Sequence, residues 1–148
     1  MNVLVIDGQG GGLGRQLVAA LSAQCPDIRL VAVGTNSVAA QAMHKAGAQR
    51  AATGENAVVV NCRNADIIVG PIGIVIADAL LGEITPAMAV AVGQSGAKKL
   101  LLPVNQCSNI VVGTQDLTLS RLMDEAVELL RSLLDRNSPA KPDKPQRP

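Results

Sequence analysis

A run of glycines follows the first apolar segment of the chain. After residues 3–6 comes the turn Gly8-Gln9-Gly10-Gly11-Gly12-Leu13-Gly14. Glycines let a backbone turn sharply and approach a ligand closely. A helix that begins near Leu13 would direct free N–H groups and the positive end of its dipole at an anion. The pattern indicates a phosphate-binding turn, and the alternative is a tight turn that binds nothing.

The spacing Gly8-x-x-x-Gly12-x-Gly14 resembles the nucleotide-binding half of short-chain dehydrogenases and reductases, as does the segment Asp66-Ile67-Ile68-Val69-Gly70. This resemblance implies a site for NADP or NAD. The same family transfers protons with a Tyr-x-x-x-Lys pair, and this chain contains no tyrosine. The resemblance therefore implies a ligand class and no reaction.

Few side chains near the turn could take part in catalysis. We expect Asp7 to accept hydrogen bonds from the glycine turn itself. Glu55 and Glu83 could act as bases or bind Mg²⁺ together with Asp7. Cys107 could be a nucleophile, but the single histidine, His44, falls late in a predicted helix and away from it. The three cysteines are too widely spaced for a metal site, and we predict none.

Further polar or turn-forming residues follow other predicted strands or begin predicted helices. The carboxyl ends of parallel strands meet at one edge of a sheet, so these residues should converge on the glycine turn. Each of them alone could instead be a helix cap or a turn residue. The predicted binding set outside the turn is Thr35, Asn36, Thr53, Glu55, Asn56, Gly70, Pro71 and Asn105, with Gln106 beside it.

The choice between NADP and NAD depends on the end of the second predicted strand. An NAD site usually has an acidic residue there, which binds the ribose hydroxyls. This chain has Gly34-Thr35-Asn36 at that point, with Arg15 on the preceding predicted helix. Neutral groups and an arginine would tolerate a 2′-phosphate, so the sequence favours NADP over NAD.

Apolar runs alternate with helical patterns along the chain, which predicts α/β architecture. We expect a three-layer, doubly wound, mostly parallel, Rossmann-like sheet in a domain of residues 1–136, followed by a disordered tail of residues 137–148. Expected caps are Ser37, Thr53 and Thr85. The predicted strands are 3–6, 28–33, 49–52, 66–70, 99–103 and 109–112, and the predicted helices are 13–24, 37–45, 53–62, 72–81, 85–95 and 119–134.

Composition narrows the class of partner. The 148 residues carry a net charge of +1 and include no Phe, Tyr or Trp. The chain therefore lacks both a basic surface and the stacking rings that nucleic-acid binders use. No signal peptide or membrane span is predicted, and we expect a cytoplasmic protein. Residues 86–93 are apolar all round. This favours a homodimer or a higher homo-oligomer that uses these residues or the equally apolar residues 72–81, unless the final helix covers residues 86–93.

Most of the chain, residues 1–135, resembles the small bacterial Rossmann-like proteins of domain-of-unknown-function family 3842. That resemblance implies a fold and no activity. We expect a nucleotide-binding protein, an oxidoreductase if the cofactor performs hydride transfer; the alternative is a non-catalytic oligomeric sensor of a nucleotide or phosphorylated metabolite. The resembling segments are Ile6-Asp7-Gly8-Gln9-Gly10-Gly11-Gly12, Gly34-Thr35-Asn36, Ala52-Thr53-Gly54-Glu55-Asn56-Ala57, Gly70-Pro71-Ile72-Gly73 and Gly82-Glu83-Ile84-Thr85-Pro86-Ala87-Met88-Ala89.

Overall fold

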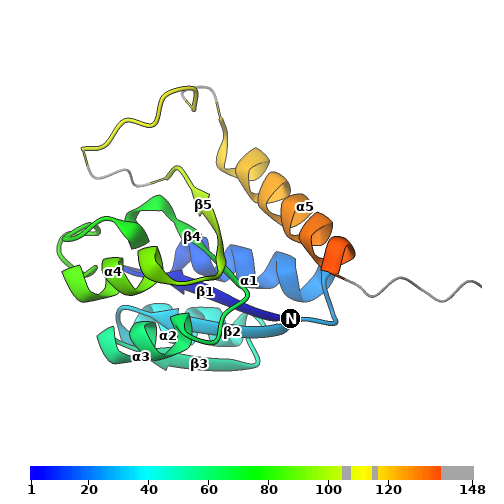
Figure 1. The fold of residues 1–148 in the computed structure, drawn as a ribbon, viewed down its shortest axis with the longest axis horizontal. Helices are drawn as coiled ribbons and strands as arrows, with labels where there is room; N and C mark the ends of the chain where they lie inside the picture. Colours follow the sequence, from blue (N-terminus) through cyan, green and yellow to red (C-terminus); the bar gives the residue numbers. More distant parts are fainter. Residues whose placement is uncertain (105–107, 115–116, 138–148) are drawn as a thin grey trace, which may run out of the picture.

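The computed structural model describes residues 1–104, 108–114 and 117–137. This part of the chain contains one parallel sheet with the strand order β3-β2-β1-β4-β5 (Figure 1). The chain first moves outward from β1 to β3, then returns to place β4 on the other side of β1. The strands are β1 (Asn2–Asp7), β2 (Arg29–Gly34), β3 (Arg50–Thr53), β4 (Ile67–Pro71) and β5 (Lys98–Leu102).

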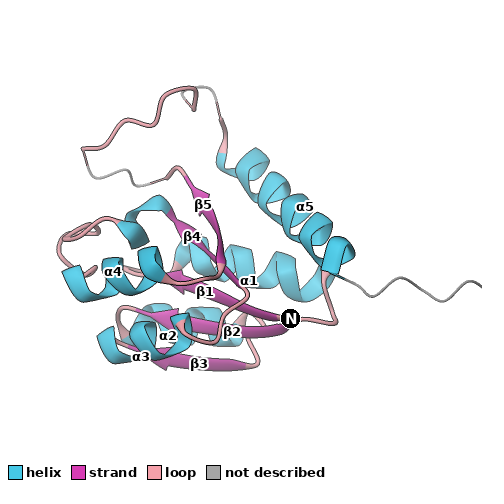
Figure 2. Cartoon of the chain, viewed as in Figure 1, coloured by secondary structure: helices cyan, strands magenta, loops and turns pink. Residues whose placement is uncertain are grey.

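Helices cover both faces of the sheet (Figure 2), which confirms the predicted three-layer, doubly wound, Rossmann-like α/β fold. One face packs against the first, second and last of the α-helices, and the other packs against the third and fourth. A short 3₁₀ helix, η1, follows β4. The helices are α1 (Gly12–Gln24), α2 (Ser37–Lys45), α3 (Glu55–Cys62), η1 (Ile72–Val75), α4 (Pro86–Gln94) and α5 (Leu119–Asn137).

The two layers of core come from the alternation of side chains along the central strand. In β1, Val3 and Val5 face the α1 and α5 side, whereas Leu4 and Ile6 face the α3 and α4 side. All four side chains are buried. An uninterrupted apolar run is typical of a strand covered on both faces. Because β1 is packed on both sides, the position at which it ends and the turn begins is held in place.

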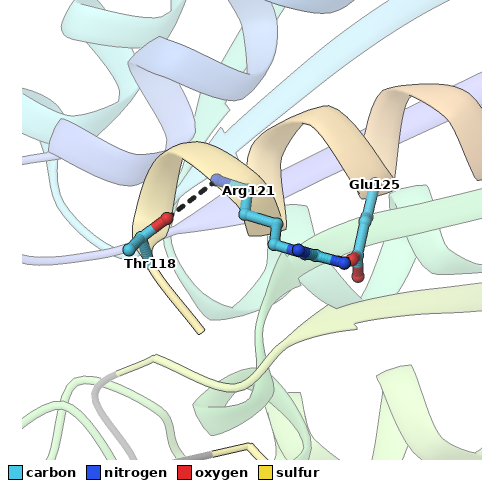
Figure 3. A network of polar contacts seen from close by, with 3 residues as sticks. All are labelled: Thr118, Arg121 and Glu125. Atoms are coloured by element: carbon cyan, nitrogen blue, oxygen red, sulfur yellow. Dashed lines mark hydrogen bonds and ion pairs between the residues drawn. The ribbon is translucent and has the colours of Figure 1, made fainter. Parts of the chain in front are cut away.

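Helix α5 begins with local polar contacts (Figure 3). The Thr118 hydroxyl accepts a hydrogen bond from the Arg121 N–H over 3.3 Å. One turn later, the Arg121 guanidinium pairs with Glu125 over 3.1 Å. The apolar side of α5 packs against α1 in the core cluster that also holds Val3 and Val5. Helix α5 therefore cannot be the cover for α4, which belongs to the other cluster.

The structure corrects several expected elements. Residues 72–81 are not one helix: η1 ends at Val75, and an irregular segment leads from there to α4. Residues 109–112 form no strand within the described part of the chain. Helix α2 is capped by Asn36 and not by Ser37. Helix α3 begins after Gly54, whose φ is 97°, so Thr53 is not its cap.

The predicted start of α4 is confirmed. The Thr85 hydroxyl accepts a hydrogen bond from the Met88 N–H over 3.2 Å, and Pro86 occupies the first turn.

Nearly all of the tail predicted to be disordered lies outside the described residues. In the ranges that the structure covers, no helix is both long enough and apolar enough to span a membrane.

Candidate functional site

The glycine turn lies where the winding of the sheet reverses. Strand β1 has β2 on one side and β4 on the other, and the turn leaves β1 at its carboxyl end. The crevice at such a reversal point is the usual ligand site of open parallel α/β sheets. Gly70 and Pro71, at the end of β4, are buried beside it. The fold therefore places the predicted turn at the expected edge.

Asp7 organises this turn from inside, as the sequence predicts. Its side chain is only 4% exposed. One carboxylate oxygen accepts a hydrogen bond from the Gly8 N–H over 2.8 Å, and the other accepts one from the Gly14 N–H over 2.7 Å. Two backbone N–H groups of the turn are therefore satisfied by the protein and are not available to an anion.

A second carboxylate reaches the turn from the segment between η1 and α4. Oε2 of Glu83 accepts a hydrogen bond from the Gln9 N–H over 2.9 Å, one from the Asn36 Nδ2 over 2.9 Å, and a short one from the Thr35 hydroxyl. Asn36 Nδ2 also donates to the Gln9 carbonyl over 2.8 Å. Glu83 thus joins the glycine turn to the residues that follow β2.

Close packing requires glycine at several positions of the turn, including Gly14, where a Cβ would lie 2.7 Å from the Asp7 Cβ. A Cβ on Gly8 would lie 2.7 Å from the Thr35 hydroxyl oxygen and 3.0 Å from Glu83 Oε2. Gly11 has a φ of 71° and lies against the backbone of α2, where a Cβ would be 2.7 Å from the Ala39 Cα. An L-residue side chain at any of these places would displace the turn.

Three N–H groups of the turn remain available. Those of Gly10, Gly12 and Leu13 form no hydrogen bond with any residue that the structure describes. Gly10 and Gly12 are exposed, and a Cβ on either would meet open space. Gly12 and Leu13 begin α1, so the positive end of a 13-residue helix adds to these donors. This arrangement is suited to an anionic oxygen group.

The two carboxyl groups differ in acidity. Burial raises the pKa of Asp7, the hydrogen bonds from Gly14 and Gly8 offset part of that rise, and the charge of Glu83 adds to it. Burial also acts to raise the pKa of Glu83, but the hydrogen bonds from Thr35, Gln9 and Asn36 together outweigh it, so this pKa is lowered from its ordinary value of 4.5. Glu83 is therefore held in its ionised form at neutral pH.

The other predicted site residues are placed differently. Thr53, Glu55 and Asn56 lie at the end of β3 and the start of α3, and none of them forms a hydrogen bond with the glycine turn or Glu83 in the described part of the chain. Asn105, Gln106 and Cys107 lie outside the described residues. Cys25 and Cys62 are buried core residues, and burial raises the pKa of Cys62 to about 11.

The binding set predicted from the sequence omits Glu83, which the sequence offers only as a base or Mg²⁺ ligand. The sequence also predicts a helix over residues 72–81. The segment instead holds Asp78, Leu80 and Leu81 in left-handed backbone conformations, with φ of 63°, 56° and 57°. Each such residue costs on the order of 1 kcal/mol. The signal in the sequence that could have identified Glu83 as a site residue is the Gly82-Glu83 pair directly after that segment.

The described residues contain no group of three or more His, Cys, Asp or Glu side chains that could hold a metal ion.

A hollow of about 480 Å³ lies at the edge of the sheet opposite the glycine turn. It includes the first residues of β1, β2 and β3, which are Asn2, Arg29 and Arg50. The residues that line it do not include the backbone donors of the glycine turn.

Comparison with known proteins gives a family match and one solved structure. Residues 2–135 match the model of a family described as "Domain of unknown function (DUF3842)". No curated protein matches the chain. A dodecameric FMN-dependent UbiX-like decarboxylase from Escherichia coli O157:H7 is 16% identical, with a TM-score of 0.42 and 100% of both chains covered. The resemblance of the N-terminal half to short-chain dehydrogenases stays a prediction.

The acidity of Glu83 leads to a pH-dependent prediction for Glu83→Gln. Because the pKa of Glu83 is lowered by folding, its contribution to stability is complete above pH 4.5 and is lost as the pH falls through the folded-state value. We expect the variant to be less stable by about 1 kcal/mol at pH 7, a modest figure because the side chain is partly exposed. The difference should shrink below pH 4.5.

Urea unfolding followed by circular dichroism measures this difference, since the chain has no aromatic fluorophore. The variant also removes the Glu83 charge that helps to raise the pKa of Asp7, so the Asp7 pKa falls in the variant and offsets part of the stability difference at neutral pH. Glu128→Gln, which removes an exposed carboxylate from α5, is the matched control. A stability difference for Glu83→Gln that stays the same from pH 7 to pH 3 would show that folding does not lower this pKa.

Proposed function

We propose that this chain, which belongs to the DUF3842 family, binds a nucleotide by placing its phosphates at the start of α1. The observation that carries the proposal is the group of three adjacent N–H donors, those of Gly10, Gly12 and Leu13, that no described residue satisfies. They lie at the reversal point of a parallel sheet. Phosphates bind at such helix starts through backbone donors and the helix dipole.

The difference between the bound and the unbound N–H groups of the turn supports this proposal over a purely structural turn. A turn that only connected β1 to α1 could satisfy its donors from Asp7, as Gly8 and Gly14 do. Here the protein satisfies the N–H groups of Gly8, Gln9 and Gly14 with carboxylates. The N–H groups of Gly10, Gly12 and Leu13 have no partner among the described residues, and Gly10 and Gly12 are exposed. An anion between them would be bound by neutral donors and would compensate the unpaired N–H groups.

We infer that the nucleotide is a dinucleotide cofactor, NADP or NAD, as the glycine spacing indicates. A neutral end of β2 would favour NADP. In the folded protein this end is acidic, because the Glu83 carboxylate accepts hydrogen bonds from both Thr35 and Asn36. The choice between the two cofactors therefore depends on Glu83.

Hydride transfer would suit the site as an activity because the cofactor supplies that chemistry. Among the described side chains, Asp7 and Glu83 are the ionisable groups bonded to the turn, and both are engaged in positioning it. This favours the alternative function, a non-catalytic module that senses a nucleotide. Both functions require the same phosphate site.

We also propose a homo-oligomer, in its simplest form a homodimer, that covers the outer side of α4. Val90 is 53% exposed there, and Val60 of the neighbouring α3 is also exposed. Helix α5, the alternative cover for residues 86–93, packs on the other face of the sheet. Burial of such residues against a second copy would stabilise the pair through the hydrophobic effect.

Substitution of Gly12 tests the phosphate site. A leucine at position 12 has room in the fold, but its side chain tilts toward the start of α1, where the phosphate would bind. We expect Gly12→Leu to weaken ADP binding by at least about 10-fold, because one charge-assisted hydrogen bond is worth that much. Isothermal titration calorimetry measures the affinity.

Gly93→Leu is the matched control, because Gly93 is also an exposed helical glycine with open space around it and lies at the far end of α4. It should bind ADP as the unmodified protein does. Equal affinity of Gly12→Leu and the unmodified protein for ADP would place the ligand elsewhere.

Sedimentation velocity tests the oligomer. We expect the unmodified protein to sediment as a dimer or larger assembly and Val90→Glu to shift it toward the monomer, since a charge on the apolar face would be desolvated. Leu129→Glu, an exposed apolar position on α5, should leave the assembly unchanged. A monomer at every concentration of the unmodified protein would exclude the proposed assembly.

A further inference from the structure

The carboxylate of Glu83 lies at the end of β2, although it comes from a different part of the chain. Thr35 and Asn36 directly follow β2, and both donate hydrogen bonds to Glu83 Oε2. In dinucleotide-binding sheets, an acidic residue at this position accepts hydrogen bonds from the hydroxyls of the adenosine ribose. The sequence of β2 lacks such an acid, and the fold supplies one from the segment that precedes α4.

This segment is anchored firmly enough to hold an acceptor in place. Leu80 and Ile84, which flank Glu83, are 2% and 1% exposed and belong to the core cluster beneath α4. The segment also closes on itself: the Asp78 N–H donates to the Ile84 carbonyl over 2.7 Å, and the Ile84 N–H donates to the Ala79 carbonyl over 3.1 Å. Glu83 therefore projects from a short, doubly anchored loop.

The backbone of the same segment is strained. Asp78, Leu80 and Leu81 all have left-handed φ values, which residues other than glycine rarely adopt. Leu81 is 96% exposed, so burial of its side chain does not compensate for its conformation. Strain of this kind is concentrated at ligand-binding segments, where a side chain must be presented in one orientation. Here the side chain presented is that of Glu83.

The hydrogen bonds of Glu83 leave capacity for a ligand. All three donors meet at Oε2, whereas Oε1 accepts no hydrogen bond from the residues that the structure describes. An ionised carboxylate accepts only, and its two oxygens offer several lone pairs. A pair of neighbouring hydroxyl groups would be a suitable donor. A phosphate at the same place would be repelled.

Glu83 and the free amides also lie at adjacent points of one turn. Glu83 binds the N–H of Gln9, and the first unsatisfied donor, that of Gly10, is the next residue. A ligand that reaches both would carry a hydroxyl-bearing sugar next to its phosphates, which is the order of groups in an adenosine diphosphate.

We propose that Glu83 binds the ribose 2′- and 3′-hydroxyls of the nucleotide whose phosphates occupy the amides of Gly10, Gly12 and Leu13, and that it selects NAD over NADP by repelling a 2′-phosphate. The proposal rests on the phosphate site proposed above. Thr35 and Asn36 act as positioning residues, because they hold the carboxylate that contacts the ligand.

Calorimetric titration of the unmodified protein and Glu83→Gln with NAD and NADP tests the selection. The unmodified protein should bind NAD at least about 10-fold more tightly than NADP, the worth of one hydrogen bond to a charged group. Glu83→Gln should bind NAD about 10-fold more weakly and NADP no more weakly, so the preference should disappear. Glu128→Gln should keep the preference of the unmodified protein.

A ligand-side measurement keeps the test independent of how Glu83→Gln folds. The unmodified protein should bind 2′-deoxy-ADP about 10-fold more weakly than ADP, since one donor to Glu83 is missing. Equal binding of these two ligands, or an NAD preference that survives in Glu83→Gln, would overturn the role of Glu83 and leave the phosphate site standing. If neither ADP nor NAD binds the unmodified protein, both proposals fail.

Discussion

Backbone N–H groups at the turn between β1 and α1 set the main constraint on this molecule. A buried donor without a partner is costly, so each of these groups must be satisfied by the protein, by water or by a ligand. Asp7 satisfies those of Gly8 and Gly14 from within, and Glu83 satisfies that of Gln9 from the segment between η1 and α4. The N–H groups of Gly10, Gly12 and Leu13 remain without a partner among the described residues, and we assign them to a phosphate.

The same constraint explains why a strained segment is kept between η1 and α4. Glu83 can reach Gln9, Thr35 and Asn36 only if the chain turns back after η1, and left-handed residues at Asp78, Leu80 and Leu81 provide that path. A regular helix over these residues would avoid the strain. Core packing of Leu80 and Ile84 stabilises the irregular path instead.

Much of the fold could be predicted from local pattern, because β1 alternates between two buried faces and Thr85-Pro86 is a strong helix start. The role of Asp7 was also predictable, since it adjoins the glycines that it binds. The position of Glu83 was not, because three non-glycine residues near it adopt conformations that their own propensities oppose. For the same reason, the end of β2 read as neutral in the sequence and is acidic in the structure.

The central claim concerns three particular amides, and their NMR signals test it most directly. In a titration of the ¹⁵N-labelled full chain with ADP, we expect the largest shifts at Gly10, Gly12 and Leu13, with smaller ones at Gly8 and Gly14, whose N–H groups are already bound to Asp7. Shifts confined to the hollow around Asn2 and Arg29 at the opposite sheet edge, or no shifts at saturating ADP, would contradict the account.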